Sequence, residues 1–153
     1  MSYTTSEGRE SLMGDVGRAL EQLAFALACL GEAYELVDEG AADRLEEGLF
    51  RPVRSAYARA RRALSGFAAR HDLQAAPASQ PDSSGLHSAD PRVYLERAIE
   101  ASSRAEAVIA ELQDSMLPVE VGDQELRQDL TEVRALLGQV PARGQALLRT
   151  LGR

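Results

Sequence analysis

The spacing of apolar residues limits the fold of this chain more than any other feature, because it alternates between three and four positions. From about residue 8 to residue 39 these positions are Val16, Leu20, Leu23, Leu27, Leu30, Tyr34 and Val37. A mean step of 3.5 residues is that of α-helices that pack side by side with a left-handed crossing. Similar steps run through about 43–71, 91–115 and 123–151. Abundant Leu and Ala and the absence of Trp also favour helix over strand.

Prolines and a polar segment mark where these helices are interrupted. Pro52 removes a backbone donor from the second segment, so we expect a kink near residues 48–52. Pro141 is expected to bend the fourth segment for the same reason. Residues 74–88 are rich in Pro and Ser and have no apolar periodicity, which is typical of a flexible loop. Asp90 and Pro91 have the composition of a helix start, and Gly40 that of a helix stop.

Together these segments predict an all-α fold, an elongated antiparallel four-helix bundle. We expect an up-down-up-down order, with two helical hairpins joined by the Pro/Ser-rich loop. The length of 153 residues favours a single domain spanning 1–153. A first helix of about 32 residues would be about 48 Å long, which makes the bundle elongated.

The inventory of reactive side chains excludes most kinds of catalytic or metal site. All basic residues are Arg, so no lysine is present for Schiff-base or P-loop chemistry; this bias fits a GC-rich, bacterial coding sequence. The only histidines, His71 and His87, lack the spacing of a zinc site, and we expect His71 to cap its helix. No paired Glu-x-x-His motif is present for a di-iron centre. We therefore expect no enzyme activity, no metal and no cofactor.

An arginine-rich run in the second helical segment is the sharpest charge feature. Residues 51–71 carry six arginines and no acid, in a chain whose formal net charge is -7. A helical projection puts them on the face away from the core, and the candidates for a partner surface are Arg51, Arg54, Arg59, Arg61 and Arg62. Three interpretations stay open. The face is solvated and partly paired with the acidic first helix, it docks an acidic protein, or it binds nucleic acid or phosphate. The net acidity of the chain, and Tyr57 as the single candidate for base stacking, disfavour nucleic acid.

The first helical segment has a second apolar stripe. Phe25, Cys29 and Leu36 project away from the main apolar face, and Ala26 and Ala33 extend this side. A helix in a four-helix bundle needs only one apolar face. We therefore expect a partner interface here, formed with a second copy of the chain about a two-fold axis. The alternatives are cover by the 74–88 loop or the chain ends, and a groove for the helix of another protein.

These features favour a non-enzymatic protein–protein interaction module that associates with itself as a homodimer. The alternative is a regulator that binds a small molecule among small core residues such as Ala60, Ser102, Ala105 and Gly144, or that binds nucleic acid or phosphate on the arginine face. The polar N-terminus and the lack of an apolar stretch of about 20 residues predict neither a signal peptide nor a membrane span. The single cysteine fits a reducing compartment, so we expect a cytoplasmic location.

A measurement of mass in solution tests the predicted homodimer. By light scattering after size-exclusion chromatography, the wild type should have twice the 16.5 kDa mass of the chain. Phe25→Glu should have the mass of one chain, because a buried carboxylate in the apolar stripe would be costly. If both proteins are folded monomers, the stripe is covered by the chain itself or takes a different protein.

Overall fold

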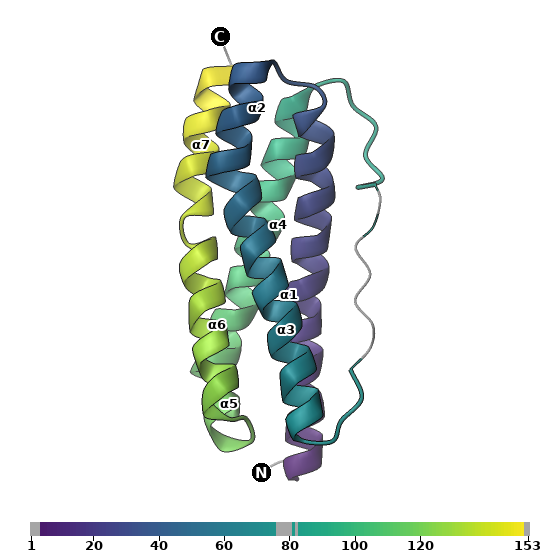
Figure 1. Cartoon of the computed structure of the whole chain (residues 1–153), viewed down its shortest axis with the longest axis vertical. Helices are drawn as coiled ribbons and strands as arrows, with labels where there is room; N and C mark the ends of the chain where they lie inside the picture. Colours follow the sequence, from purple (N-terminus) through teal and green to yellow (C-terminus); the bar gives the residue numbers. More distant parts are fainter. Residues whose placement is uncertain (1–3, 76–80, 82, 152–153) are drawn as a thin grey trace.

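The computed structural model describes residues 4–75, 81 and 83–151. Its elements are α1 (Thr5–Tyr34), α2 (Glu39–Leu45), the π-helical turn η1 (Glu46–Phe50), α3 (Arg51–Arg70), α4 (Pro91–Asp114), α5 (Leu117–Glu120), α6 (Gln124–Leu137) and α7 (Val140–Leu151). No strand is present in the described part of the chain. The elements form four long rods, which are α1, α2–η1–α3, α4 and α6–α7 (Figure 1). The all-α fold class is therefore confirmed.

Polar contacts between helix ends give the direction of each rod. Arg70 at the end of α3 pairs with Asp123, just before α6, at 2.7 Å. Arg92 at the start of α4 donates a hydrogen bond to the carbonyl of Leu148, near the end of α7, at 2.7 Å. The α6–α7 rod is therefore antiparallel to both α3 and α4.

The start of α1 lies at the end of the molecule where α4 ends. There the Arg9 Nε–H donates to the Val121 carbonyl, in the connection that follows α4, at 3.0 Å. Counted along the chain, the rods therefore run up, down, down and up (Figure 1). The predicted up-down-up-down order is not confirmed. The reason is the position of α4: residues 83–90 run beside α1, and α4 then starts beside the end of α1 and not beside the end of α3.

This long connection still leaves every neighbouring pair of rods antiparallel. α1 packs against α3 and α4, and α6–α7 packs against the same two rods from the other side. α3 and α4, which run in the same direction, lie diagonally across the bundle, in front and behind in Figure 1. The arrangement is that of a four-helix bundle with one long crossover connection.

Side-chain caps define most helix starts. Asp90 and Asp123, at two of the predicted starts, accept hydrogen bonds from the backbone of Arg92 and Leu126. The first helix ends earlier than predicted, because Asp38 caps the new helix α2 by accepting from the Ala41 N–H at 2.8 Å. The predicted stop at Gly40 is therefore wrong, since this glycine lies inside α2.

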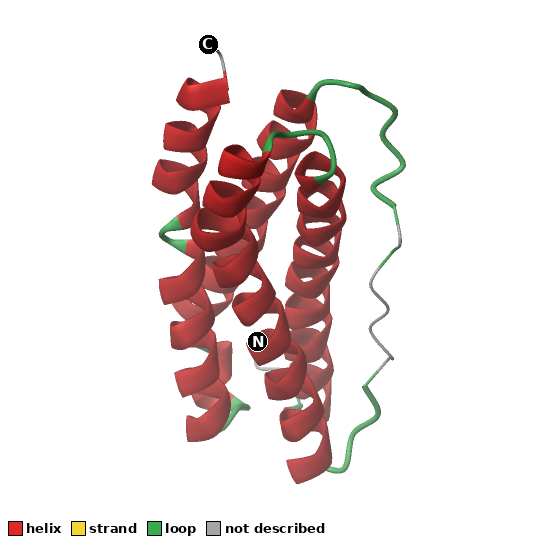
Figure 2. Cartoon of the chain, turned by 45° about the horizontal axis from the view of Figure 1, so that its top comes forward, coloured by secondary structure: helices red, strands yellow, loops and turns green. Residues whose placement is uncertain are grey.

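Both predicted proline interruptions are present. Ahead of Pro52 the chain forms the π-turn η1, in which the Arg51 N–H donates to the carbonyl of Glu46, five residues back. The wider turn is a known response to a lost helical hydrogen bond. At Pro141 the fourth rod does not merely bend. It breaks at Gly138–Gln139, so that the proline lies in the first turn of α7 (Figure 2).

The buried apolar side chains form one cluster that involves all four rods. The most extensive helix contact is that between α1 and α4. Both helices bury rows of alanines, which allow close approach, and these are Ala19, Ala26 and Ala33 on α1 and Ala98, Ala101 and Ala105 on α4. None of the helices in the described residues is long and apolar enough to cross a membrane.

Two glycines test the packing of the rods. Gly144 on α7 is buried, and a Cβ there would overlap the side chain of Ile99 on α4. We expect Gly144→Ala to lower the free energy of unfolding by about 1–3 kcal/mol through overpacking. A Cβ at Gly14, within α1, would meet nothing within 4 Å. As the matched control, Gly14→Ala should raise the free energy of unfolding by about 0.5–1 kcal/mol. Urea denaturation measures both, and equal effects would contradict the close α4–α7 contact.

Candidate functional site

The outer side of α1 carries the first surface predicted to bind a partner, and the chain itself covers part of it. Residues 83–90, here called the strap, run beside α1 toward the start of α4 (Figure 1). Glu32 on α1 accepts hydrogen bonds from the Ser83 hydroxyl at 3.0 Å, from the Ser84 N–H at 3.0 Å and from the Ser84 hydroxyl at 2.5 Å. The Ser84 hydroxyl in turn holds the pKa of Glu32 below its ordinary value. Residues 76–80 and 82 of the predicted flexible loop lie outside the described residues.

Tyr94 anchors the other end of the strap. Its hydroxyl lies 3.2 Å from the Leu86 carbonyl and 3.1 Å from the Ser88 carbonyl, and it accepts from the Ser88 N–H at 3.0 Å. Leu86 also packs against the core. The strap is therefore attached to both α1 and α4.

Cys29 lies beneath this layer and is completely buried. Burial, with a smaller effect of the neighbouring Glu32 carboxylate, raises the pKa of the Cys29 thiol to about 11. The thiol is therefore protonated near neutral pH, which disfavours nucleophilic chemistry. In this conformation its side chain is also closed to any partner.

The predicted stripe on α1 does not form one continuous exposed face. Phe25 is half-buried against the core, and Leu36 lies beyond the end of α1, where it is 43% exposed beside Tyr34 at 42%. The second apolar side of α1 has an intramolecular explanation, since this helix lies between α3 and α4 and also faces the strap. One alternative from the sequence is that the 74–88 loop covers the stripe. This holds for Cys29, whereas Leu36 stays accessible.

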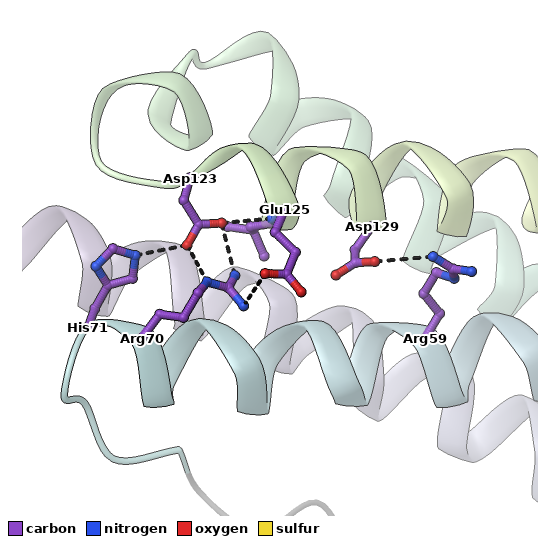
Figure 3. Close-up of polar contacts among 7 residues, drawn as sticks. Arg59, Arg70, His71, Asp123, Glu125 and Asp129 are labelled. Carbon is purple, nitrogen blue, oxygen red and sulfur yellow. Dashed lines mark hydrogen bonds and ion pairs between the residues drawn. The ribbon is translucent and has the colours of Figure 1, made fainter.

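The arginine face of α3 is divided by the acids that surround it. Arg59 pairs with Asp129 on α6 at 3.2 Å, and Arg70 pairs with Asp123 and, at 3.0 Å, with Glu125 (Figure 3). These two arginines lie along the seam between α3 and α6. The expected pairing with the first helix is not seen among the described residues, because the nearest acids lie on η1 and α6.

Asp123 is the centre of this seam. It caps α6, pairs with Arg70 and lies 2.9 Å from His71 Nε2 (Figure 3). His71 is the C-cap residue of α3, as predicted. Partial burial raises its pKa, but the hydrogen bonds from Arg70, from the Leu126 N–H and from His71 outweigh this effect and lower the pKa to about 2. The same contact raises the pKa of Arg70. The seam therefore fixes the end of α3 to the start of α6.

The two arginines near the start of α3 form ion pairs with acids of the π-turn. Arg51 pairs with Glu47 at 3.3 Å, and Arg54 pairs with Glu46 at 3.1 Å. The Arg54 guanidinium also lies 4.7 Å from the centre of the Phe50 ring, within cation–π distance. These pairs are largely exposed to solvent, so each contributes little stability but restricts the position of its arginine.

Arg61 and Arg62 have no ion pair within residues 4–75, 81 and 83–151, and both are exposed. They lie midway along α3. Of the five predicted arginines, the structure thus leaves two unpaired in the described chain and ties three to nearby acids. A helical projection could not distinguish the paired arginines from the unpaired ones, because it contains no contacts with other elements.

Two further arginines were not among the predicted surface residues. Arg44 on α2 and Arg143 on α7 line one groove together with Arg51, and we call this the basic groove. Arg44 lies seven residues, about two helical turns, before Arg51, so a helical projection already puts both on the side away from the core. Arg143 had no such signal, because its approach depends on how α7 packs against η1.

Other kinds of site find little support in the described residues. No group of three or more His, Cys, Asp or Glu side chains there is placed to hold a metal ion. Of the small core residues weighed for a ligand cavity, Gly144 faces the Ile99 side chain, which fills the space above it. Ser102 is buried and donates to the Ala98 carbonyl at 2.8 Å within α4. The core alternative therefore has no supporting void at these positions.

Comparisons with known proteins identify no relative. No protein-family model matches the chain, and no curated protein or solved structure does. The function proposed below therefore depends on the geometry of this chain alone.

The seam at Asp123 predicts a loss of stability in acid. Because the pKa of Asp123 is about 2 in the folded chain and 3.8 ordinarily, its contribution is present above about pH 4 and is lost as pH falls toward 2. Asp123→Asn keeps a capping side chain but removes the charge, so we expect it to lower the free energy of unfolding by about 1–2 kcal/mol at pH 7 and by much less at pH 2.5. Urea denaturation at both pH values measures this. Glu125→Gln, at a more exposed partner of Arg70, is the control and should change less than about 0.5 kcal/mol. A deficit of Asp123→Asn that is equal at both pH values would contradict the seam.

Proposed function

We propose that this chain is a non-enzymatic, cytoplasmic protein–protein interaction module that docks an acidic partner on the outer face of α3. The observation that carries the proposal is the pair Arg61 and Arg62, exposed on a helix that contains no acid and unpaired within the described residues. Arg54, on the same helix, is paired with Glu46 and so adds little net charge to this patch. In a chain of net charge -7, such a patch favours approach of an acidic surface in one orientation.

The surroundings of these arginines support a protein partner over nucleic acid. Tyr57, the candidate for base stacking, is only 7% exposed. Single-stranded nucleic acid is usually held by exposed aromatic side chains together with basic ones. α3 offers guanidinium groups without an exposed aromatic side chain beside them, which suits carboxylates of an acidic protein segment.

Self-association remains part of the proposal, with a changed contact surface. Tyr34 and Leu36 are two of the exposed large hydrophobic side chains; Tyr34 is the last residue of α1, and Leu36 lies in the turn before α2. Exposed large apolar side chains at one end of the bundle are candidates for an interface. In the measurement of mass described above, Leu36→Glu is therefore the sharper variant, because Phe25→Glu would also disturb the core. Val119→Glu, exposed at the opposite end of the bundle, is its control.

Charge reversal tests the acidic-partner surface. A fluorescent peptide of about ten glutamates serves as the probe, and anisotropy at low and at moderate salt gives its affinity. We expect Arg61→Glu/Arg62→Glu to weaken binding at least tenfold, since repulsion replaces two charge contacts. Arg97→Glu/Arg149→Glu changes the net charge equally, but at exposed arginines of α4 and α7.

The control separates a local surface from a general field. If both double variants weaken peptide binding equally, docking on α3 is contradicted, and only a long-range attraction between the peptide and the positive charges of the chain is left. Absence of binding by the wild type at low salt would contradict the proposal altogether. Circular dichroism verifies that each variant keeps its helical content.

A further inference from the structure

We infer that the basic groove is a binding site for a phosphate monoester group. The groove has a volume of about 640 Å³ and lies between η1, α3 and α7, next to α2. Arg61 and Arg62 do not line it, so this inference is independent of the acidic-partner surface. Its three arginines come from three separate elements, Arg44 from α2, Arg51 from the start of α3 and Arg143 from α7.

The charge of the groove matches a phosphate monoester better than a carboxylate or a phosphodiester. Three guanidinium groups and one carboxylate, Glu47, give a local formal charge of about +2. A phosphate monoester carries about -1.5 to -2 at neutral pH and presents three acceptor oxygens. A carboxylate, or one phosphodiester of a nucleic acid, carries a single charge and would leave part of the groove uncompensated.

The donors around the groove also suit a tetrahedral anion. A guanidinium group offers a planar set of N–H donors that can bind two oxygens of a phosphate. The Gln139 amide and the Ser55 hydroxyl, which line the groove as well, offer uncharged donors. The described lining contains no aromatic side chain on which a base could stack. The groove therefore recognises the phosphate and not an attached ring.

Glu47 now occupies the place of an anion at Arg51. Their closest atoms are 3.3 Å apart, and their side chains are 61% exposed for Arg51 and 71% exposed for Glu47. Such exposed pairs are weak, so an incoming dianion can replace this carboxylate. Glu47 also repels an anion, so its charge lowers the affinity of the empty groove.

The backbone explains why these residues meet. Gly48, in the π-turn, has no side chain, and a Cβ there would lie 3.8 Å from the Cβ of Arg143. α7 therefore approaches η1 closely at this point. The approach brings Arg143 to the same groove as the arginines of α2 and α3.

Titration with small anions tests the site. The probes are inorganic phosphate, a short uncharged peptide that carries one phosphoserine, and the same peptide with glutamate in its place, each followed by NMR of the full chain. We expect saturable shifts at residues 44–55 and 139–143 with phosphate and phosphoserine, and affinity at least fivefold lower for the glutamate peptide. Arg143→Gln should weaken phosphoserine binding about tenfold, as expected for losing charge-assisted hydrogen bonds. Arg149→Gln, on the same helix but outside the groove, should leave it unchanged.

Glu47→Gln provides the opposite prediction, because removing the one carboxylate in the described lining of the groove should raise the affinity for phosphate severalfold. The two phosphate sources are then distinguished by the wild type. Tighter binding of the peptide than of inorganic phosphate indicates a phosphorylated protein segment, and equal binding indicates a small phosphate compound. Absence of saturable shifts, or equal effects of Arg143→Gln and Arg149→Gln in folded variants, would overturn the inference.

Discussion

Close packing of α1 against α4 is the constraint on which the rest of the structure depends. Rows of buried alanines on both helices let the two backbones approach over most of their length. Because α4 runs antiparallel to α1, it starts at the end of the bundle opposite to the end of α3, and residues 83–90 lead into it beside α1. The strap and the burial of Cys29 follow from that path. The diagonal placement of α3 and α4 also follows, as does the contact of α6–α7 with both of them.

Two kinds of surface result on α3. Toward α6, the arginines meet acids near the start of that helix and hold the two rods in register. Away from α6, the helix faces solvent, and its charge stays available to other molecules. The π-turn that Pro52 enforces adds a third environment, since it brings α2 and α7 to the same end of α3 and places their arginines around one groove. Stability and the proposed recognition thus use the same residue type, separated by the position of a few carboxylates.

Local signals in the sequence predicted the helices well. Apolar spacing gave the four rods, Asp90 and Asp123 gave two starts, and Pro52 and Pro141 gave both interruptions. The order of the rods could not be predicted, because a long connection can lead to either neighbouring position. The candidate site was predictable only as a helix face. Which arginines are paired, and that Arg143 joins Arg44 and Arg51, depends on contacts between segments far apart in sequence, for which the chain has no local pattern.

The late position of α4 has a consequence for synthesis. α1 is synthesised before α4, the helix that packs against it and that begins at Pro91. The hairpin of α1 and α3 therefore exists for a time without α4 beside α1. Until α4 has been synthesised, the nascent chain presents the alanine row of α1 and the neighbouring Cys29 without the helix that later packs against α1. The thiol that is buried in the finished bundle is therefore more accessible to oxidants during this interval than afterwards.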